Sequence, residues 1–576
     1  MTKRERVKRR IDLAAGRDKV ELLLKNCKIV NVFNHKIIEG NIAIDSGKII
    51  GIGDYTGHKE IDMNFNYVAP GLIDSHEHLE SAMVTPAQMS RVVVPRGTTT
   101  IIADPHEIAN VCGIKGIKFM MDSAADAPLN VFFMLPSCVP ATEFETSGAK
   151  LMAKDLEALI SQDNVLGLGE LMDFPGVING REDIIDKMMI AQNKIIDGHG
   201  PVITDKDLNA YLINGIKTDH ECGSIHEMND RLDRGMYIAI REGSAARNLK
   251  ALIQGVTEYN SRRITLCTDD KNPEDILKEG HIDFSVRKAI SYGIDPITAI
   301  QMATINTAEC YLLRDIGAIA PGYDADLIVI DDLKAFNVLQ VYKKGKKVAE
   351  NGKALFDVEE TDTTNVVNTV NMKPVKAENL HLKLESDVVQ VISVLPYSLV
   401  TERNVRRVTI NADGHFEKHK HIDIVKLAVI ERHKETGNIG LGLVENFKIT
   451  GGAIATTIGH DSHNLIVIGD NDKDMIKAIE EVEKLQGGIA VVHNNKVDSL
   501  QLRIAGLMSD QPMEVVAEKL EELLSIAHNE LGVNHKIDPF MTLSFLALPV
   551  IPDIKLTDKG LFDVLKFDFM DVEVKD

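Results

Sequence analysis

The sequence is poor in cysteine and contains no cysteine motif. Its six cysteines lie far apart, form no C-x-x-C pair, and none follows Cys310. A disulfide-stabilised secreted domain needs closely spaced, paired cysteines, so this pattern indicates reduced, buried thiols. We therefore expect a cytoplasmic protein.

Long hydrophobic runs are also missing. No stretch approaches the roughly 18 consecutive apolar residues of a membrane-spanning helix. The basic start, MTKRERVKRRIDLAAGRDK, is not followed by the apolar segment of roughly 7 to 15 residues that a secretory signal requires. We expect no membrane partner and interpret the start as a surface helix, with a basic binding arm as the alternative.

Positive charge is in deficit. The chain carries 65 Lys and Arg against 86 Asp and Glu, which gives a formal net charge of −21. Such a surface repels phosphate backbones and anionic membranes. We therefore expect no nucleic-acid partner.

The length of the chain implies several domains. With 576 residues, 44% of them hydrophobic, the chain exceeds what one core organises. We predict an α/β fold with a (β/α)8 TIM-like barrel at residues 67–315. A small β-sandwich combines the flanking segments 1–66, which opens with the N-terminal helix, and 316–355. A polar linker at 356–395 leads to a C-terminal α/β (α+β) domain at 396–576.

The sandwich prediction rests on two similar stretches that lie far apart in the chain. Short β-branched runs separated by turns occur in VELLLKNCKIV and NIAIDSGKIIGIG, and the same texture returns in GAIAPGYDADLIVIDD and FNVLQVYKKGKKVAENGK. Runs of this kind are typical of strands. We expect the two stretches to pair, with the barrel inserted between them.

The barrel prediction rests on eight apolar runs with amphipathic segments between several of them. The runs are GLIDSHEH, TTTIIADPH, NVFFMLPS, NVLGLGEL, KIIDGHG, IKTDHECGS, MYIAIREGS and RRITLCTDD. Continuous apolar runs followed by helices indicate buried parallel strands. Eight of them over roughly 200 residues favour a closed barrel over an open doubly wound sheet.

His76 and His78 close the first of these runs. Two residues apart in a strand, they leave the same face, whereas Glu77 points away. Spacing alone is weak evidence, because 19 histidines in 576 residues give roughly 0.6 H-x-H pairs by chance, and His419 with His421 forms a second pair. The position of His76 and His78 at the end of a barrel strand, where barrel enzymes keep their sites, is the stronger argument.

Ionisable residues end four other runs as well. They are Glu170, His199, His220 and Asp269 with Asp270. Each histidine taken singly could be an ordinary hydrogen-bonded side chain. Together, imidazoles and carboxylates crowded at one barrel mouth would be costly without a cation. Nitrogen and oxygen ligands suit zinc, iron or manganese, and a strand-end aspartate can take a proton from metal-activated water.

These residues resemble the amidohydrolase superfamily, through GLIDSHEH, RGTTT, the strand-8 aspartate and PGYDADLIVID. Within it the chain is most similar to the prokaryotic adenine deaminases, through APGLIDSHEHLES, ADPHEIANVCG, GLGELMDFPGV, DGHGP, TDHECGS and LCTDD. ERHKETGNIGLGLV, GHDSHNLIVIG and HNNKVDSLQLRIAGLMSD extend the resemblance through the C-terminal part.

The resemblance implies a two-metal hydrolase that converts adenine to hypoxanthine and ammonia. It implies attack of a metal-bound hydroxide on C6, with Mn²⁺ or Fe²⁺ as the ions and Zn²⁺ as an alternative. Asp269 would also shuttle the proton, and Glu170 would bridge the ions in place of the carbamylated lysine that many superfamily members use. The implied ligands are His76, His78, Glu170, His199, His220 and Asp269.

Further polar residues are candidates for substrate contact or for support of the ligands. His106 and Glu107 follow the second strand and could orient the purine, bind an extra ion or simply cap a loop. Asp270 directly follows Asp269, and a swap of ligand role between the two stays open. His460, Asp461 and His463 belong to a polar C-terminal cluster that could cap the site, contact another subunit or form an ordinary loop.

Two other functions stay open. One is a different amidohydrolase reaction, on a cyclic amide or an N-acetyl substrate, because fold and metals would be shared. The other is a non-catalytic scaffold on the same fold. We also expect a homo-oligomer, a dimer or larger.

Overall fold

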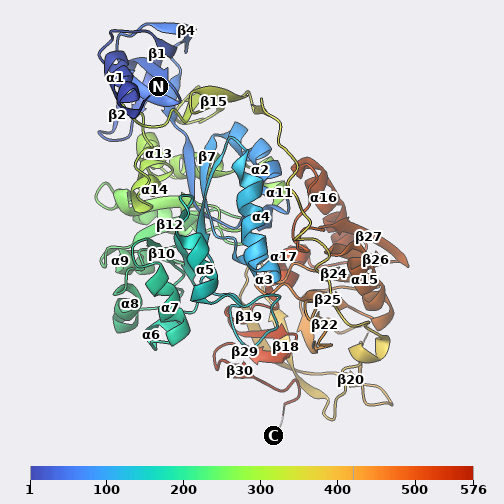
Figure 1. Ribbon diagram of the computed structural model, residues 1–576. Coiled ribbons are helices and arrows are strands. Elements are labelled where there is room, and N and C mark those ends of the chain that lie inside the picture. Colours follow the sequence, from blue (N-terminus) through green and yellow to red (C-terminus); the bar gives the residue numbers. More distant parts are fainter. Residues whose placement is uncertain (1, 420, 575–576) are drawn as a thin grey trace.

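The computed structural model describes residues 2–419 and 421–574. They form a small sheet near the N-terminus, a barrel of parallel strands with outer helices, and a C-terminal α/β unit beside the barrel (Figure 1). The N-terminal helix α1 (Lys3–Ala14) is mostly exposed and anchors on the small sheet through buried Leu13. No helix in the described part of the chain is long and apolar enough to cross a membrane.

Segments from both sides of the barrel build the small sheet. Its strands are β1 (Val20–Asn31), β2 (Lys36–Asp45), β3 (Lys48–Ile52), β4 (Gly57–Asp62), β5 (Tyr67–Pro70), β14 (Leu327–Ile330), β15 (Val338–Lys343), β16 (Lys346–Glu350) and β17 (Lys353–Ala354). β5 and β14 pair antiparallel, with Ala69 opposite Ile328, and so join the two halves. The predicted pairing of the distant segments is confirmed, and it produces one nine-stranded sheet.

All eight predicted apolar runs form barrel strands. They are β6 (Leu72–Glu77), β7 (Thr98–Ala103), β8 (Asn130–Leu135), β9 (Val165–Leu171), β10 (Ile195–Gly198), β11 (Thr218–Asp219), β12 (Tyr237–Arg241) and β13 (Ile264–Cys267). β6 to β10 and β11 to β13 form two parallel sheets. Parallel bridges between Ile196 and Ile216, and between Glu77 and Asp269, join these sheets and close the barrel.

Helices cover the outside of the barrel. They are α2 (Pro86–Val93), α3 (His106–Cys112), α4 (Ile114–Ala125), α5 (Ala153–Ile160), α6 (Phe174–Ile178), α7 (Glu182–Ile190), α8 (Asp205–Leu212), α9 (Ile225–Leu232), α10 (Leu249–Leu252), α11 (Pro273–Lys278), α12 (Ile282–Ser291), α13 (Pro296–Met302) and α14 (Ile305–Cys310). Ser224 and Glu227 form a capping box at the start of α9. Asp295 caps α13, with Pro296 at its first position. Every residue of β6, β7 and β13 is buried, because core surrounds these strands on both sides.

The C-terminal unit is built on an eight-stranded sheet with helices. The sheet contains β18 (Val388–Val394), β19 (Thr401–Arg407), β22 (Ile424–Ile430), β23 (Ile439–Glu445), β24 (Gly452–Thr456), β25 (Leu465–Gly469), β26 (Gly488–His493) and β27 (Lys496–Gln501). Two smaller sheets contain β20 (Thr409–Ile410), β21 (Phe416–Glu417), β28 (Ile554–Thr557), β29 (Gly560–Asp563) and β30 (Asp568–Phe569), and the main helices are α15 (Asp472–Leu485), α16 (Met513–Asn529) and α17 (Pro539–Phe545). β18 lies within the range predicted as a polar linker, so part of that range is a strand and not a linker. Its short run VVQVISV carries enough β-branched residues for a sheet position.

The C-terminal unit packs against the mouth of the barrel. The backbone amide of Ser509 donates to Met83 at 2.8 Å. The loop after β8 is held from two sides, because Asp558 accepts from the amide of Thr146 at 2.8 Å and Asn464 donates to the carbonyl of Thr146 at 2.8 Å. These contacts bring residues 456–464 next to the ends of the first barrel strands.

Candidate active site

The six residues named as ligands from the sequence lie together at one end of the barrel. Each belongs to the carboxyl end of a strand or to the residues that follow it, and the strands involved are β6, β9, β10, β11 and β13. The residues are His76, His78, Glu170, His199, His220 and Asp269. Five of them are buried, and the side chain of His199 is 19% exposed. Strand ends of a parallel barrel meet at one rim, which explains why a linear pattern could predict this cluster.

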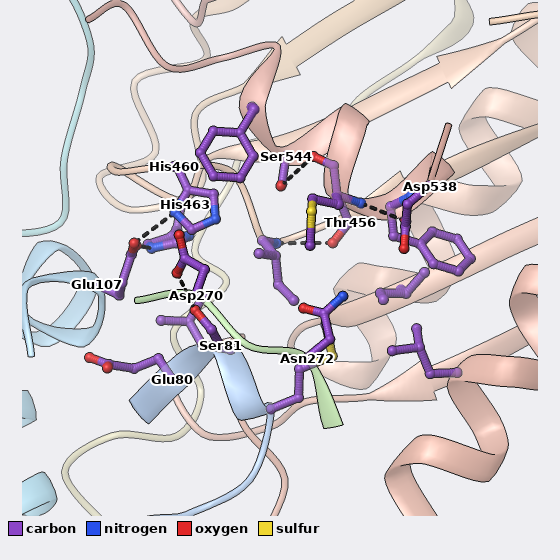
Figure 2. Close-up of a pocket in the computed structure, with 18 residues that line it drawn as sticks. Glu80, Ser81, Glu107, Asp270, Asn272, Thr456, His460, His463, Asp538 and Ser544 are labelled. Atoms are coloured by element: carbon purple, nitrogen blue, oxygen red, sulfur yellow. Dashed lines mark hydrogen bonds and ion pairs between the residues drawn. The ribbon is translucent and has the colours of Figure 1, made fainter. Parts of the chain in front are cut away.

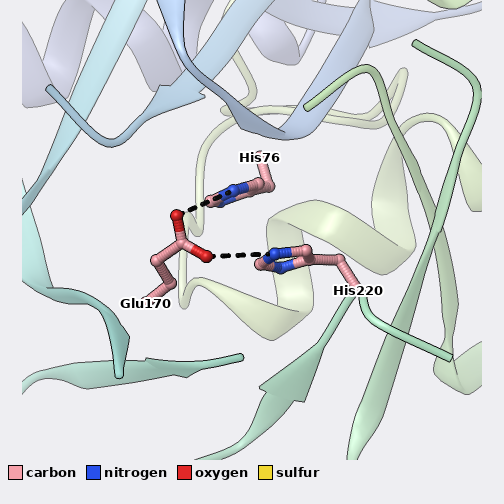
Figure 3. A group of neighbouring side chains, drawn as sticks. All are labelled: His76, Glu170 and His220. Atoms are coloured by element: carbon pink, nitrogen blue, oxygen red, sulfur yellow. Dashed lines mark ion pairs between the residues drawn. The ribbon is translucent and has the colours of Figure 1, made fainter. Parts of the chain in front are cut away.

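Glu170 lies at the centre of the histidines. Its Oε1 atom is 3.2 Å from Nε2 of His78. Its Oε2 atom is 2.7 Å from Nδ1 of His199 and 3.1 Å from Nε2 of His220. Figure 3 shows the carboxylate facing both His76 and His220, whose rings are stacked with centroids 4.2 Å apart. Burial would raise the pKa of Glu170, but the charge and hydrogen bonds of the imidazoles outweigh it and hold the pKa well below its usual value.

Asp269 faces the same cluster from the other side. Its Oδ1 atom is 3.2 Å from Nε2 of His78 and 3.7 Å from Nε2 of His76. Asp269 has φ of 60°, a left-handed conformation that ends the strand. Asp270 therefore takes a different direction and accepts a hydrogen bond from Oγ of Ser81 at 2.5 Å. The geometry separates the two neighbouring aspartates, with only Asp269 among the imidazoles.

The hydrogen bonding of these histidines suits a cation. Nδ1 of His78 lies 3.0 Å from the carbonyl oxygen of Asp104, so Nδ1 carries a proton and Nε2 is the ring nitrogen that faces the carboxylates. Nε2 of His76 and Nδ1 of His106 are buried and have no hydrogen-bond partner among the described residues. Buried polar atoms without partners are rare, and ring nitrogens that face paired carboxylates are the donor set that a divalent ion requires.

Sequence reasoning missed two charged residues of this site. Nη1 of Arg241 donates to Oδ2 of Asp269 at 2.9 Å, and Nη2 donates to Glu221 at 3.1 Å. Glu221 in turn lies 3.6 Å from Nε2 of His220. Arg241 is the last residue of β12, so the rule that identified the other strand ends also applied to this strand and would have found it.

A second polar group joins the barrel to the C-terminal unit. Glu107, at the start of α3, lies 3.3 Å from Nε2 of His106 and 2.7 Å from Nδ1 of His460, and it also pairs with His463. Asp461 lies beside this group and is buried. Burial is the main cause that raises its pKa to about 6.

Glu107, His460 and His463 border a pocket between the two units (Figure 2). Its barrel side includes Ser81, Glu107 and Asp270, and its C-terminal side includes Phe545 and Met541. An apolar cavity with a few convergent polar groups is the usual form of a small-molecule site. The cluster at 460–463, distant in sequence, thus lies at the barrel mouth.

Comparison with protein families and known proteins gives a consistent result. The Amidohydrolase family matches residues 67–348, and the Adenine deaminase C-terminal domain matches residues 398–568. The chain is 56% identical to an adenine deaminase of Clostridium acetobutylicum over 98% of this chain and 100% of that protein. It is 48% identical to an adenine deaminase of Nitratidesulfovibrio vulgaris over 100% of both chains.

Among solved structures, a beta-aspartyl dipeptidase of Fervidobacterium islandicum is 18% identical, with a TM-score of 0.46, and the match covers 59% of this chain and 100% of that one. The two adenine deaminases, which match over nearly the whole chain, establish the family and confirm the resemblance predicted from the motifs. They also imply a divalent metal in a hydrolase acting on a C–N bond. The chain belongs to the adenine deaminase family of the amidohydrolases.

Proposed function

We propose that this chain hydrolyses adenine to hypoxanthine and ammonia. The observation that carries the proposal is the 56% identity to a named adenine deaminase over 98% of the chain. The geometry of the barrel mouth supports it, because the residues that resemble the family motifs converge there. A scaffold without catalytic function would have no need to keep imidazoles and carboxylates together in a buried cluster.

His76, His78, Glu170, His199, His220 and Asp269 would hold two divalent ions, with Glu170 shared between them. Nε2 of His78, which faces the carboxylates, and the unpartnered Nε2 of His76 support this assignment. All donors are nitrogen or oxygen, which fits Mn²⁺ or Fe²⁺, with Zn²⁺ as an alternative. When bound, the ions supply a water whose pKa is lowered towards about 7 and a charge that stabilises the transition state.

Asp269 is the proposed proton carrier. A carboxylate at this position takes a proton from the attacking water at Oδ1 and passes it to N1 of the purine. The remaining hydroxyl proton then moves to the exocyclic amine, the C6–N bond breaks, and ammonia leaves as C6=O forms. Burial would raise the pKa of Asp269, but the hydrogen bond from His78 and the charge of Arg241 outweigh it and hold the pKa well below its usual value. The group is therefore ionised at neutral pH and able to accept the proton.

The pocket beside the cluster is the proposed purine site. His106, Glu107 and Asp270 would orient the substrate from the barrel side. The loop with His460, Asp461 and His463 would cap it from the C-terminal side and exclude water. Contacts between Glu107 and the two histidines support this role for the loop.

We further propose a cytoplasmic homo-oligomer, a dimer or larger. The six cysteines are unpaired thiols, which fits a reducing compartment. β27 ends its sheet, and an edge strand of this kind can pair with a second copy. Light scattering on the purified chain measures the oligomeric state directly.

Ammonia release from a substrate panel tests the proposed reaction. Metal-loaded protein is incubated with adenine, guanine, cytosine, adenosine and dihydroorotate. The proposal predicts ammonia from adenine, with little from the other compounds. Hydrolysis of the cyclic amide alone would replace the deaminase assignment with another amidohydrolase reaction.

A further inference from the structure

A chain of three buried side chains crosses from the C-terminal unit to the barrel. The backbone amide of Gly459 donates to Nδ1 of His463 at 3.1 Å. Since an amide can only donate, Nδ1 of His463 is an acceptor and its ring proton lies on Nε2, which donates to Glu107. The second oxygen of Glu107 accepts from Nδ1 of His460 at 2.7 Å.

This arrangement is a hydrogen-bond relay and not a third cation site. Glu107, His460 and His463 are close enough to surround an ion. A cation, however, would need the lone pair of His463 on Nε2, and the bond from Gly459 places that lone pair on Nδ1. Glu107 thus holds the orientation of both rings.

The relay leaves the far nitrogen of His460 available. Figure 2 shows His460 at the edge of the pocket, with one ring nitrogen directed at Glu107 and the other turned away from it. Within the part of the chain that the structure describes, Nε2 has no hydrogen-bond partner. The ring packs on Phe545, with centroids 4.3 Å apart and planes 24° apart, which fixes its plane.

His460 is a hydrogen-bond donor at neutral pH. Burial alone would lower the pKa of His460, but Glu107 outweighs it and raises the pKa to about 9. Both ring nitrogens then carry protons, so Nε2 offers an N–H. The largely apolar pocket bordered by Phe545, Met541 and Ile458 suits a heteroaromatic ring with acceptor atoms on its edge.

We propose that His460 binds the substrate directly, by donating a hydrogen bond from Nε2 to a ring nitrogen of the purine. The inference rests on the proposed adenine deaminase function and adds a contact from outside the barrel. Ring nitrogens N1, N3 and N7 accept hydrogen bonds, whereas the exocyclic amine of adenine donates. Glu107 and His463 are positioning residues, because they act through the orientation of His460.

Kinetics of the metal-loaded variant His460→Ala test the contact. Loss of one charge-assisted hydrogen bond made equally in the ground and transition states should raise KM for adenine about 10- to 100-fold with little change in kcat. Metal content should stay at the wild-type level, because His460 lies outside the cluster of proposed ligands. His493→Ala, at the end of β26 in the same unit, is the matched control and should keep the wild-type KM.

Adenine analogues identify the atom that accepts the bond. The 1-deaza, 3-deaza and 7-deaza analogues are measured as competitive inhibitors of wild type and variant. One of them should bind wild type about 10- to 100-fold less tightly than the others, and this difference should disappear in His460→Ala. If His460→Ala does not fold, His460→Leu, which fills more of the same space and carries no donor, is used for the comparison.

The positioning role has its own test. Glu107→Gln should raise KM in the wild-type background and cause a much smaller rise in the His460→Ala background, because the two changes remove one interaction. Equal effects in both backgrounds would remove Glu107 from the relay. An unchanged KM in His460→Ala, in a chain that deaminates adenine, would overturn this inference alone. A wild-type chain that neither binds nor deaminates adenine would overturn the proposed function as well.

Discussion

The guanidinium of Arg241 donates a hydrogen bond to Asp269 at 2.9 Å, from the end of the neighbouring barrel strand. Arg241 is at least nine-tenths buried and also bonds Glu221, so its position is fixed from two directions. An ion pair of this kind orients the second oxygen of Asp269 and leaves the first one directed at His78. The pair sets the geometry of the proposed proton carrier.

Arg241→Gln should weaken both metal binding and turnover. Removal of a group that orients a metal ligand costs about 10- to 100-fold in affinity or activity. Mn²⁺ titration of the metal-free variant and its kcat for adenine measure the two effects. Arg234→Gln, on the outside of the barrel, is the control. If Arg241→Gln matches the wild type in both measurements, the ion pair does not support the site.

Asp269→Asn should nearly abolish turnover and leave the fold intact. The amide keeps the shape of the carboxylate but cannot take a proton, and loss of a general base costs about 10²- to 10⁴-fold in rate. Adenine deamination and circular dichroism of the metal-loaded variant provide the measurements. Asp270→Asn should have a smaller effect, because Asp270 contacts Ser81 and not the imidazoles. Near-normal activity of Asp269→Asn would assign the proton transfer to another group.

Glu170→Gln should release metal. The carboxylate lies within 3.2 Å of His78, and it also contacts His199 and His220. The neutral amide cannot offset the charge of two cations at this position. Elemental analysis should therefore find clearly less metal per chain than in the wild type, with activity at background. Retention of the full metal content would show that Glu170 does not bridge the ions.

Lys555 gives the fold a pH dependence. Its side chain is fully buried in β28, Nζ donates to the carbonyl of Leu399 at 2.9 Å, and burial lowers its pKa from 10.5 to about 7. Between pH 10.5 and about 7 the unfolded chain takes up a proton that the folded chain does not. The free energy of unfolding therefore falls as the pH falls through this window, and the penalty is complete below it.

Lys555→Met should remove this penalty. The variant should be more stable than the wild type by on the order of several kcal/mol at pH 7, and the difference should shrink towards pH 10. Chemical unfolding at a series of pH values measures it. Lys566→Met, at an exposed lysine near the same hairpin, should keep the wild-type slope. An equal slope in Lys555→Met and wild type would mean that Lys555 is charged in the folded chain.

Much of the barrel and its mouth follows from local sequence patterns. The run GLGEL predicts a buried strand with Glu170 at its end, and Glu170 lies there because strand direction fixes the rim. The same logic brings His199 and His220 to the cluster. Arg241 also lies at a strand end. It was missed because arginine is not a residue type that binds cations.

Contacts between distant segments could not be predicted in this way. Nothing near Glu107 indicates that His460 will bond it, because the pairing depends on how the C-terminal unit packs on the barrel. Likewise, β18 lies in a stretch whose surrounding residues are polar, so its short β-branched run is recognised as a strand only from its pairing with β19 and β23 in the sheet. The different directions of the Asp269 and Asp270 side chains could not be predicted either. They depend on the φ of 60° at Asp269, which two consecutive aspartates in a sequence do not reveal.

Metal titration coupled to adenine turnover tests the central claim most directly. Metal-free protein receives Mn²⁺ in steps, and ammonia released from adenine is measured at each step. Activity should rise from background and reach a plateau at about two ions per chain. Full activity in protein shown by elemental analysis to be metal-free, or no activity at two bound ions per chain, would contradict the account.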